Sequence, residues 1–354
     1  MIAQFHTRSL CLVSLCSVLA CADANPIDDE VVDIAARVAQ PMPPAQPRAG
    51  VTTRHERRAE LDCYRMTVTG DVDAASTKFL VGAPFASIAS FRFRAPWEGA
   101  RTIKSITPLL DGTLVHRGFL YVNVDKVGVQ TRAVGANPGA DLLLAWTRAS
   151  DVLALAPSDG IPVKSGALLG IEHVYARLDG DAVGDASGVE VCVTAAPPER
   201  AVGTVRLGIE AFRGNPITAR CTPKLSQPVT IQPVLAHTRA RGRSVSLVHT
   251  RPDGSEATLF DGPPNVVQPL DRPAGAAATT LEPGSALRVT CNYDGVVMGS
   301  GRVPPYEACD VLALVSPPGA IVADLFEQLM FGNNTCMDYP RQPAAEAPSR
   351  AAAP

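Results

Sequence analysis

Apolar and polar residues alternate along short segments of this chain, and turn-forming residues separate the segments. Val245, Leu247 and His249 alternate with a second set of residues that includes two serines, close to the two-residue period of a half-buried β-strand. Residues 252–254, Pro-Asp-Gly, favour a turn, and residues 257–260 can return as an antiparallel strand. The pattern predicts a β-hairpin in this part of the chain.

Further segments of the same kind run through the rest of the sequence. Helical periodicity is rare, charged residues make up only 19% of the chain, and Gly (28) and Pro (31) are abundant, which favours an all-β protein with many turns. Strands are predicted over residues 64–69, 79–81, 91–93, 102–110, 114–125, 142–146, 152–156, 167–178, 185–194 and 286–293. Residues 161–166 are predicted to form a loop. Residues 321–330, where apolar side chains recur every four positions, are predicted to form one amphipathic helix.

The 354 residues are enough for two domains of ordinary size. Residues 195–200, Ala-Ala-Pro-Pro-Glu-Arg, are predicted to link a first domain over residues 59–196 to a second over residues 201–340. Residues 25–58 are Pro-rich and mixed in charge, which predicts a disordered tether. Residues 341–354 are Ala- and Pro-rich and are predicted to be an unstructured tail.

The N-terminus has the features of an export signal over residues 1–24. A weakly positive start at Arg8 precedes an apolar run over residues 10–20 that is too short to span a membrane. Residues 22–24, Ala-Asp-Ala, fit an ordinary signal-peptidase site, whereas residues 18–21, Val-Leu-Ala-Cys, fit a bacterial lipobox. The mature chain is therefore expected outside the cytoplasm, either secreted or as a cell-envelope lipoprotein whose membrane attachment is a lipid at Cys21.

Nine cysteines are present, and three of them, Cys11, Cys16 and Cys21, belong to the export signal. The other six are Cys63, Cys192, Cys221, Cys291, Cys309 and Cys336. An even number in an exported chain argues for disulfides, and six cysteines allow fifteen pairings. No Cys-x-x-Cys pair occurs, which argues against a zinc knuckle or a thioredoxin-like site.

Other classes of function lack their sequence signals. The net charge is −3 without a large charged block, so nothing suggests a nucleic-acid partner. The chain contains no Gly-x-Ser-x-Gly, no His-Glu-x-x-His and no P-loop, the motifs of common hydrolases and nucleotide-binding proteins.

Several segments, in order, resemble those of one known family. They are Asp-Cys-Tyr at 62–64, VHRGFLY at 115–121, the segment 160–194, HTRARGRS at 237–244, LEPGSALRVTCNYDG at 281–295 and YEAC at 306–309. Over residues 61–338 the chain resembles the copper type II, ascorbate-dependent monooxygenases, the group of peptidylglycine α-hydroxylating and dopamine β-monooxygenases. The resemblance implies two antiparallel, jelly-roll-like β-sandwich domains in tandem. It also implies the disulfides Cys63–Cys192, Cys221–Cys336 and Cys291–Cys309.

The family holds one copper ion in each domain, and the first uses three histidines. His116 stands at one of these positions, but Arg117 and Val174 stand at the other two. His173 is adjacent to the third position, although on a strand it points to the opposite face unless a bulge shifts the register. The resemblance therefore leaves His116 and His173 as candidate metal ligands of a degenerate site.

The second copper ion of the family is held by two histidines and a methionine. Here the resemblance places His237, Arg239 and Ala308 at these positions. Residues two apart on a strand share a face, so Arg239 would lie beside His237. A guanidinium stays charged and has no lone pair to donate, so weak, substoichiometric copper is expected at both sites.

Two main hypotheses of function follow. In the first, the chain is a non-catalytic envelope protein that binds a small molecule or a protein in the cleft between the domains, where Arg117 and Arg239 form an anion site. In the second, it is a copper-dependent monooxygenase with altered ligands that hydroxylates a small organic substrate. A structural lipoprotein without a ligand is a third alternative.

Overall fold

The structure is a computed structural model. It describes residues 48–336 apart from 74–76, 82–86, 133–139, 148–150, 176–181, 212, 239–240, 268–277, 296, 299–306 and 322–333. The described part is all β, without a helix. Accordingly, it contains no helix with the length and apolar character that a membrane span requires. The predicted export signal, the C-terminal tail and the helix predicted at 321–330 fall almost wholly outside the described residues.

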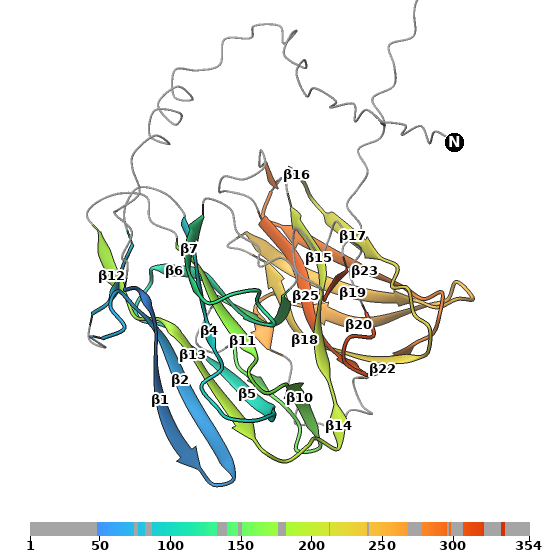
Figure 1. The fold of residues 1–354 in the computed structure, drawn as a ribbon. Helices are drawn as coiled ribbons and strands as arrows, with labels where there is room; N and C mark the ends of the chain where they lie inside the picture. Colours follow the sequence, from blue (N-terminus) through green and yellow to red (C-terminus); the bar gives the residue numbers. More distant parts are fainter. Residues whose placement is uncertain are drawn as a thin grey trace, which may run out of the picture. The chain divides into compact units, whose positions relative to one another are not determined.

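The first half of the chain forms two main sheets, antiparallel apart from the pair β10–β14, which we call the N-terminal sandwich (β1–β14; Figure 1). The first sheet has the order β1 (Gly50–Arg58), β2 (Leu61–Thr69), β13 (Gly188–Thr194), β5 (Arg101–Leu109), β10 (Asp159–Val163) and β14 (Arg200–Ala201), with β9 (Leu153–Ala154) on β5. The second has the order β7 (Gly128–Arg132), β4 (Ser87–Arg94), β11 (Leu168–Tyr175), β6 (Val115–Val122) and β8 (Asp141–Trp146). A small ribbon pairs β3 (Phe79–Val81) with β12 (Val183–Asp185).

The second half repeats this architecture in what we call the C-terminal sandwich (β15–β26). One sheet has the order β21 (Val266–Val267), β18 (Val229–Thr238), β25 (Glu307–Ser316), β15 (Gly203–Ala211) and β26 (Thr335–Cys336), with β22 (Thr279–Leu281) on β18. The other has the order β17 (Ile217–Cys221), β23 (Ala286–Tyr293), β19 (Gly242–Thr250) and β20 (Glu256–Gly262). A two-stranded ribbon pairs β16 (Arg213–Gly214) with β24 (Val297–Met298).

The all-β, sandwich-like fold confirms the prediction of fold class. The hairpin predicted around the Pro-Asp-Gly turn is β19 and β20, and the alternation buries Val245, Leu247 and His249. Among the described residues, no strand pairing joins the two sandwiches. Their independence as domains divided at residues 195–200 stays a prediction, because all described residues belong to one compact unit of the chain.

Two local predictions were wrong. Residues 161–166 were expected to be a loop, yet Asp159–Val163 forms β10. β14 pairs only with Asp159 and Gly160, so Pro162 lies where the strand edge is open and a proline is tolerated. The tether expected to reach residue 58 overlaps β1, an edge strand whose side chains are mostly exposed and which is held through its pairing with β2.

The three disulfides are those that the family resemblance implies. Cys63–Cys192 joins the neighbouring strands β2 and β13. Cys221–Cys336 and Cys291–Cys309 each join the two sheets of the C-terminal sandwich. Three disulfides indicate an oxidising, extracytoplasmic environment.

The strand β25 connects the two sandwiches because its two faces pack in different cores. Val311, Ala313 and Val315 belong to the core of the C-terminal sandwich. The intervening Leu312 and Leu314 belong to the apolar cluster of the N-terminal sandwich. Because side chains alternate along a strand, one strand serves both cores.

A polar contact reinforces this shared apolar surface. The Asn334 side chain accepts a hydrogen bond from the Leu142 backbone N at 2.8 Å and donates to the Leu142 carbonyl at 2.7 Å. It also donates to the carbonyl of Thr204 at 2.9 Å. Leu142 lies on β8, an edge strand, so the amide pairs with backbone groups that the sheet leaves open.

We expect Leu235→Ala, in the shared cluster, to lower the free energy of unfolding by about 2–5 kcal/mol, because it removes a side chain that is 1% exposed. Leu80→Ala is the matched control, since Leu80 is 47% exposed, and should change the stability by less than about 0.5 kcal/mol. Calorimetry should show one unfolding transition that shifts as a whole. A shared core would be contradicted if two transitions were seen and Leu235→Ala shifted only one of them.

Candidate functional site

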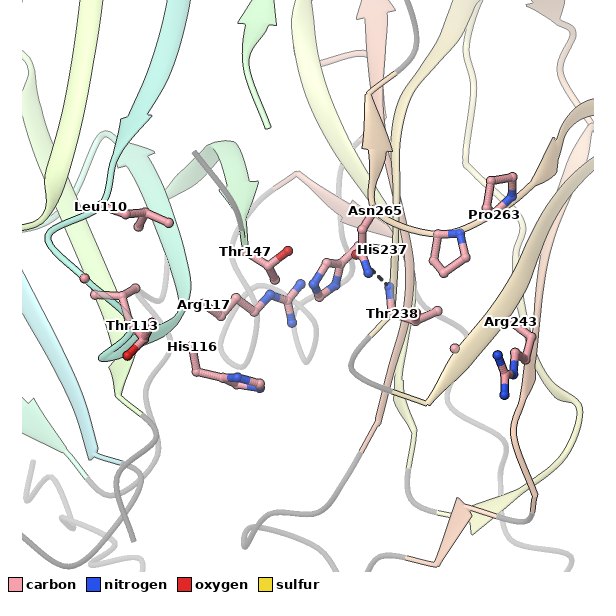
Figure 2. Close-up of a pocket in the computed structure, with 14 residues that line it drawn as sticks. Leu110, Thr113, His116, Arg117, Thr147, His237, Thr238, Arg243, Pro263 and Asn265 are labelled. Carbon is pink, nitrogen blue, oxygen red and sulfur yellow. Dashed lines mark hydrogen bonds between the residues drawn. The ribbon is translucent and has the colours of Figure 1, made fainter. Parts of the chain in front are cut away.

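A cleft of about 770 Å³ lies between the two sandwiches and is lined by both (Figure 2). Its lining consists of Leu110, Gly112, Thr113, Val115, His116, Arg117 and Thr147 from the N-terminal sandwich, and His237, Thr238, Gly242, Arg243, Pro263, Pro264 and Asn265 from the C-terminal sandwich. Two arginines and two histidines are present, but no Asp or Glu is among these described residues. The cleft thus presents cationic, neutral polar and apolar groups to a ligand.

Two strands bring the central side chains into the cleft from opposite sides. β6 carries His116, which is half-buried, and Arg117, which is 1% exposed. β18 carries His237, which is buried because both faces of this strand are covered. Figure 2 shows Arg117 extending toward His237 across the boundary between the sandwiches.

A buried carboxylate joins these groups. Asp310 on β25 is in register with His237 on β18. It accepts hydrogen bonds from Nη2 of Arg117 at 3.0 and 3.3 Å and from Nη2 of Arg206 at 2.7 Å. Burial opposes ionisation of Asp310, but attraction to Arg206 and Arg117 outweighs it and holds the pKa of the carboxyl well below its usual range. Asp310 is therefore an anion at neutral pH.

His237 lies next to this ion pair as a neutral ring. Its Nδ1 is 3.6 Å from Oδ1 of Asp310, and neither ring nitrogen has a hydrogen-bond partner in the described part of the chain. Burial, followed by repulsion from Arg117, lowers the pKa of His237 despite the opposing effect of Asp310. A buried, unsatisfied imidazole is uncommon in proteins and marks this wall of the cleft as a site for a polar partner.

Asn265 forms part of the same wall. It follows two prolines, adopts a φ of 60°, and donates its backbone N–H to the carbonyl of Ala236 at 2.6 Å. Its Oδ1 accepts a hydrogen bond from the backbone N of Thr238 at 3.4 Å. Asn is among the few residues that adopt this backbone conformation readily, so the residue type suits this position in the wall.

The candidate residues from the sequence fall in different places. His116, Arg117 and His237 line the one cleft, whereas Arg239 lies outside the described residues. His173 lies in the core of the N-terminal sandwich, with Nδ1 3.3 Å from the Tyr175 hydroxyl, and does not line the cleft. Arg117, expected to face the cleft as part of an anion site, lines the cleft and is also bonded to Asp310.

Asp310 and Asn265 were missed by the sequence reasoning. A signal for Asp310 exists, because a charged residue directly before the apolar run Val311–Val315 has to be paired when the strand is buried. The signal for Asn265 is weaker: Pro-Pro-Asn indicates a turn, but it does not show that the side chain reaches a cleft.

The described residues do not fit a copper ion in the family's geometry. The imidazoles of His116 and His237 line the cleft, and Arg117 stands at one of the positions where the resemblance places a further ligand. The single three-residue group of potential metal ligands in the described ranges is Cys63, Glu190 and Cys192. Its two sulfurs are joined in a disulfide and its carboxylate binds Arg58, so it is not available to a metal.

No protein-family model and no curated protein sequence matches the chain. Among solved structures it is similar to PNGase F, a glycosylasparaginase from Flavobacterium meningosepticum, with 11% identity over 77% of this chain and 98% of that one and a TM-score of 0.32. It is also similar to the STIV MCP, with 10% identity over 75% of this chain and 95% of that one and a TM-score of 0.25. These scores are too low to support an argument about function.

We expect Arg117→Met to destabilise the protein by about 3–5 kcal/mol, because it leaves the buried Asp310 carboxylate with one fewer cation. Arg243→Met is the control: Arg243 pairs with Asp294 where both side chains are 67% exposed, and its loss should cost less than about 1 kcal/mol. Urea unfolding of both variants measures the difference. Equal effects of the two substitutions would contradict the importance of the buried pair.

Acid should destabilise the protein in two stages. As the pH falls below the usual His value of 6.5, the unfolded chain gains a proton at His237 that the folded chain, with its lowered pKa, does not bind. As the pH falls to the usual Asp pKa of 3.8 and below, the unfolded chain likewise gains a proton at Asp310 that the folded chain, with its lowered pKa, does not bind. The free energy of unfolding should therefore fall between pH 7 and pH 5 more steeply in the wild type than in His237→Gln. Identical pH profiles from urea titrations would show that His237 does not contribute.

Proposed function

We propose that this chain is an exported, non-catalytic binding protein that holds a small organic anion in the cleft between its two sandwiches. The observation that supports this most directly is the charge of the lining: Arg117, Arg243, His116 and His237 are present, with no carboxylate among the described lining residues. Arginine side chains and neutral polar groups around a concave surface favour an anion, and guanidinium groups suit carboxylates and phosphates.

The apolar part of the lining favours an organic ligand over an inorganic ion. Leu110 and Val115 line the cleft from the N-terminal sandwich, and Pro263 and Pro264 from the C-terminal sandwich. A few polar groups that fix orientation, within a largely apolar concave surface, are typical of small-molecule sites. The ligand that fits is an anion with a small apolar body.

The alternative is a copper-dependent monooxygenase with altered ligands. One observation favours it: positions 117 and 174, which the resemblance assigns to ligands of one copper ion, are cross-strand neighbours on β6 and β11. These positions carry Arg117 and Val174, and Arg117 is bonded to Asp310. The residues present therefore support a binding function better than a redox one.

The site of action is the cell envelope or the exterior. The disulfides require an oxidising environment to form, and the two cleavage sites at the N-terminus distinguish a lipoprotein, attached through Cys21, from a secreted protein. Mass spectrometry of the mature N-terminus from a bacterial envelope fraction separates the two forms.

We expect the wild type to bind benzoate at least about tenfold more tightly than benzamide, which has nearly the same shape without the charge, because the cleft is cationic. Arg243→Gln should weaken benzoate binding. Arg288→Gln should leave it unchanged, since Arg288 pairs with Glu256 outside the cleft lining. Isothermal titration calorimetry gives the affinities.

Equal binding of benzoate and benzamide, or no binding of either, would contradict the anion site. Two tightly held copper ions per chain, with ascorbate-dependent oxygen uptake that disappears in His237→Ala, would replace the proposal with the monooxygenase alternative.

A further inference from the structure

Asn265 combines an unusual backbone conformation with a position in the cleft wall. Its φ of 60° belongs to the left-handed region, which few residues other than glycine adopt. The preceding Pro263 and Pro264 have fixed φ angles, and the backbone N–H of Asn265 is bonded to Ala236. Backbone conformations of this kind cluster at ligand-binding positions.

The rest of the wall is closely packed around this residue. Thr238, whose backbone N donates to Oδ1 of Asn265, is 0% exposed. A Cβ added to Gly242 would lie 1.8 Å from Oγ1 of Thr238, so the two strands approach each other as closely as a glycine allows. The Asn265 side chain is therefore attached to a rigid support.

The hydrogen bond to Thr238 shows which end of the Asn265 side-chain amide is already used. Because Oδ1 accepts from the backbone of Thr238, the Nδ2 group is the end that remains for another partner. No described residue supplies a hydrogen-bond acceptor to this Nδ2. An amide N–H₂ group donates and never accepts, so its partner in the cleft has to carry an acceptor oxygen.

We infer that Asn265 is a specificity-determining residue of the cleft, which donates from Nδ2 to an oxygen of the bound anion and so strengthens the preference for an anion. The inference rests on the proposed anion-binding function and adds a specificity-determining residue to it. Arg243 and His116 make the cleft attractive to anions in general. Asn265 adds a directed donor on a fixed support, and a fixed donor lowers the entropy that binding has to overcome.

Asn265→Asp tests the inference, because it keeps the shape of the side chain and its bond to Thr238 but replaces the donor with a negatively charged acceptor. We expect benzoate affinity to fall by about 10- to 100-fold, the usual effect of losing a hydrogen bond to a charged group. The cation benzamidine, which has nearly the same shape as benzoate, should bind more tightly to Asn265→Asp than to the wild type. A residue with only a structural role would weaken both probes together.

Two further variants complete the test. Asn292→Asp adds the same charge on β23, where Asn292 is exposed and its Nδ2 bonds to Ser244 at 2.9 Å, and should change neither affinity. Asn265→Gly removes the donor but allows the same backbone conformation, and should weaken benzoate without improving benzamidine. This variant tests the donor even when Asn265→Asp does not fold.

The outcomes separate the inference from the function on which it rests. If the wild type binds benzoate and Asn265→Gly binds it equally well, the role of Asn265 is overturned while the anion site stands. The same conclusion follows if Asn265→Asp weakens the binding of benzoate and of benzamidine by the same factor. Wild type that binds no benzoate overturns the proposed function and, with it, this inference.

Discussion

The arrangement of the two sandwiches depends on the ion pairs that the buried carboxylate of Asp310 forms with Arg117 and Arg206. Removing a charge from water costs several kcal/mol, so Asp310 is stable inside the protein only while cations surround it. Arg206 comes from its own sandwich and Arg117 from the other. The carboxylate therefore couples the sandwiches electrostatically, at the strand whose apolar side chains already serve both cores.

This coupling also shapes the cleft. Arg117 is held at the inner wall of the cleft by its bond to Asp310, and His237 is held there by a strand that is buried on both faces. The proposed ligand meets a preorganised surface, and preorganised groups bind a ligand at a smaller entropic cost. In this account the arginine at position 117 stabilises the interface through its pair with Asp310, and no metal is required for that role.

A strand could be predicted from the sequence where one of its faces is buried and the other is not, because only then do apolar and polar residues alternate. β19 and β20 were predicted because the buried Val245 and Leu247 alternate with partly buried residues, and a Pro-Asp-Gly turn follows. β1 was missed because its side chains lie at a solvent-exposed edge, where no hydrophobic alternation is needed. β10 was missed because residues 161–166 were predicted to form a loop, and only the pairing of its neighbours shows that Pro162 is tolerated in a strand there.

The sequence identified several residues of the candidate site but not the contacts that they make. His116, Arg117 and His237 were singled out from the sequence, and they line one cleft. That Arg117 bonds to a carboxylate 193 residues further along the chain is a long-range contact, which no local pattern contains. The left-handed conformation of Asn265 likewise depends on the bond between its backbone and Ala236.

A double-mutant cycle between Arg117 and Asp310 tests the central claim most directly. The free energies of unfolding of Arg117→Met, Asp310→Leu and the double variant are compared with that of the wild type by urea titration. Because each single substitution leaves a buried charge with fewer partners, the double variant should be more stable than the sum of the single effects predicts, by more than about 1 kcal/mol. Single effects that add to within about 0.5 kcal/mol would show that the two residues do not interact, and the account of the interface and of the cleft would be wrong.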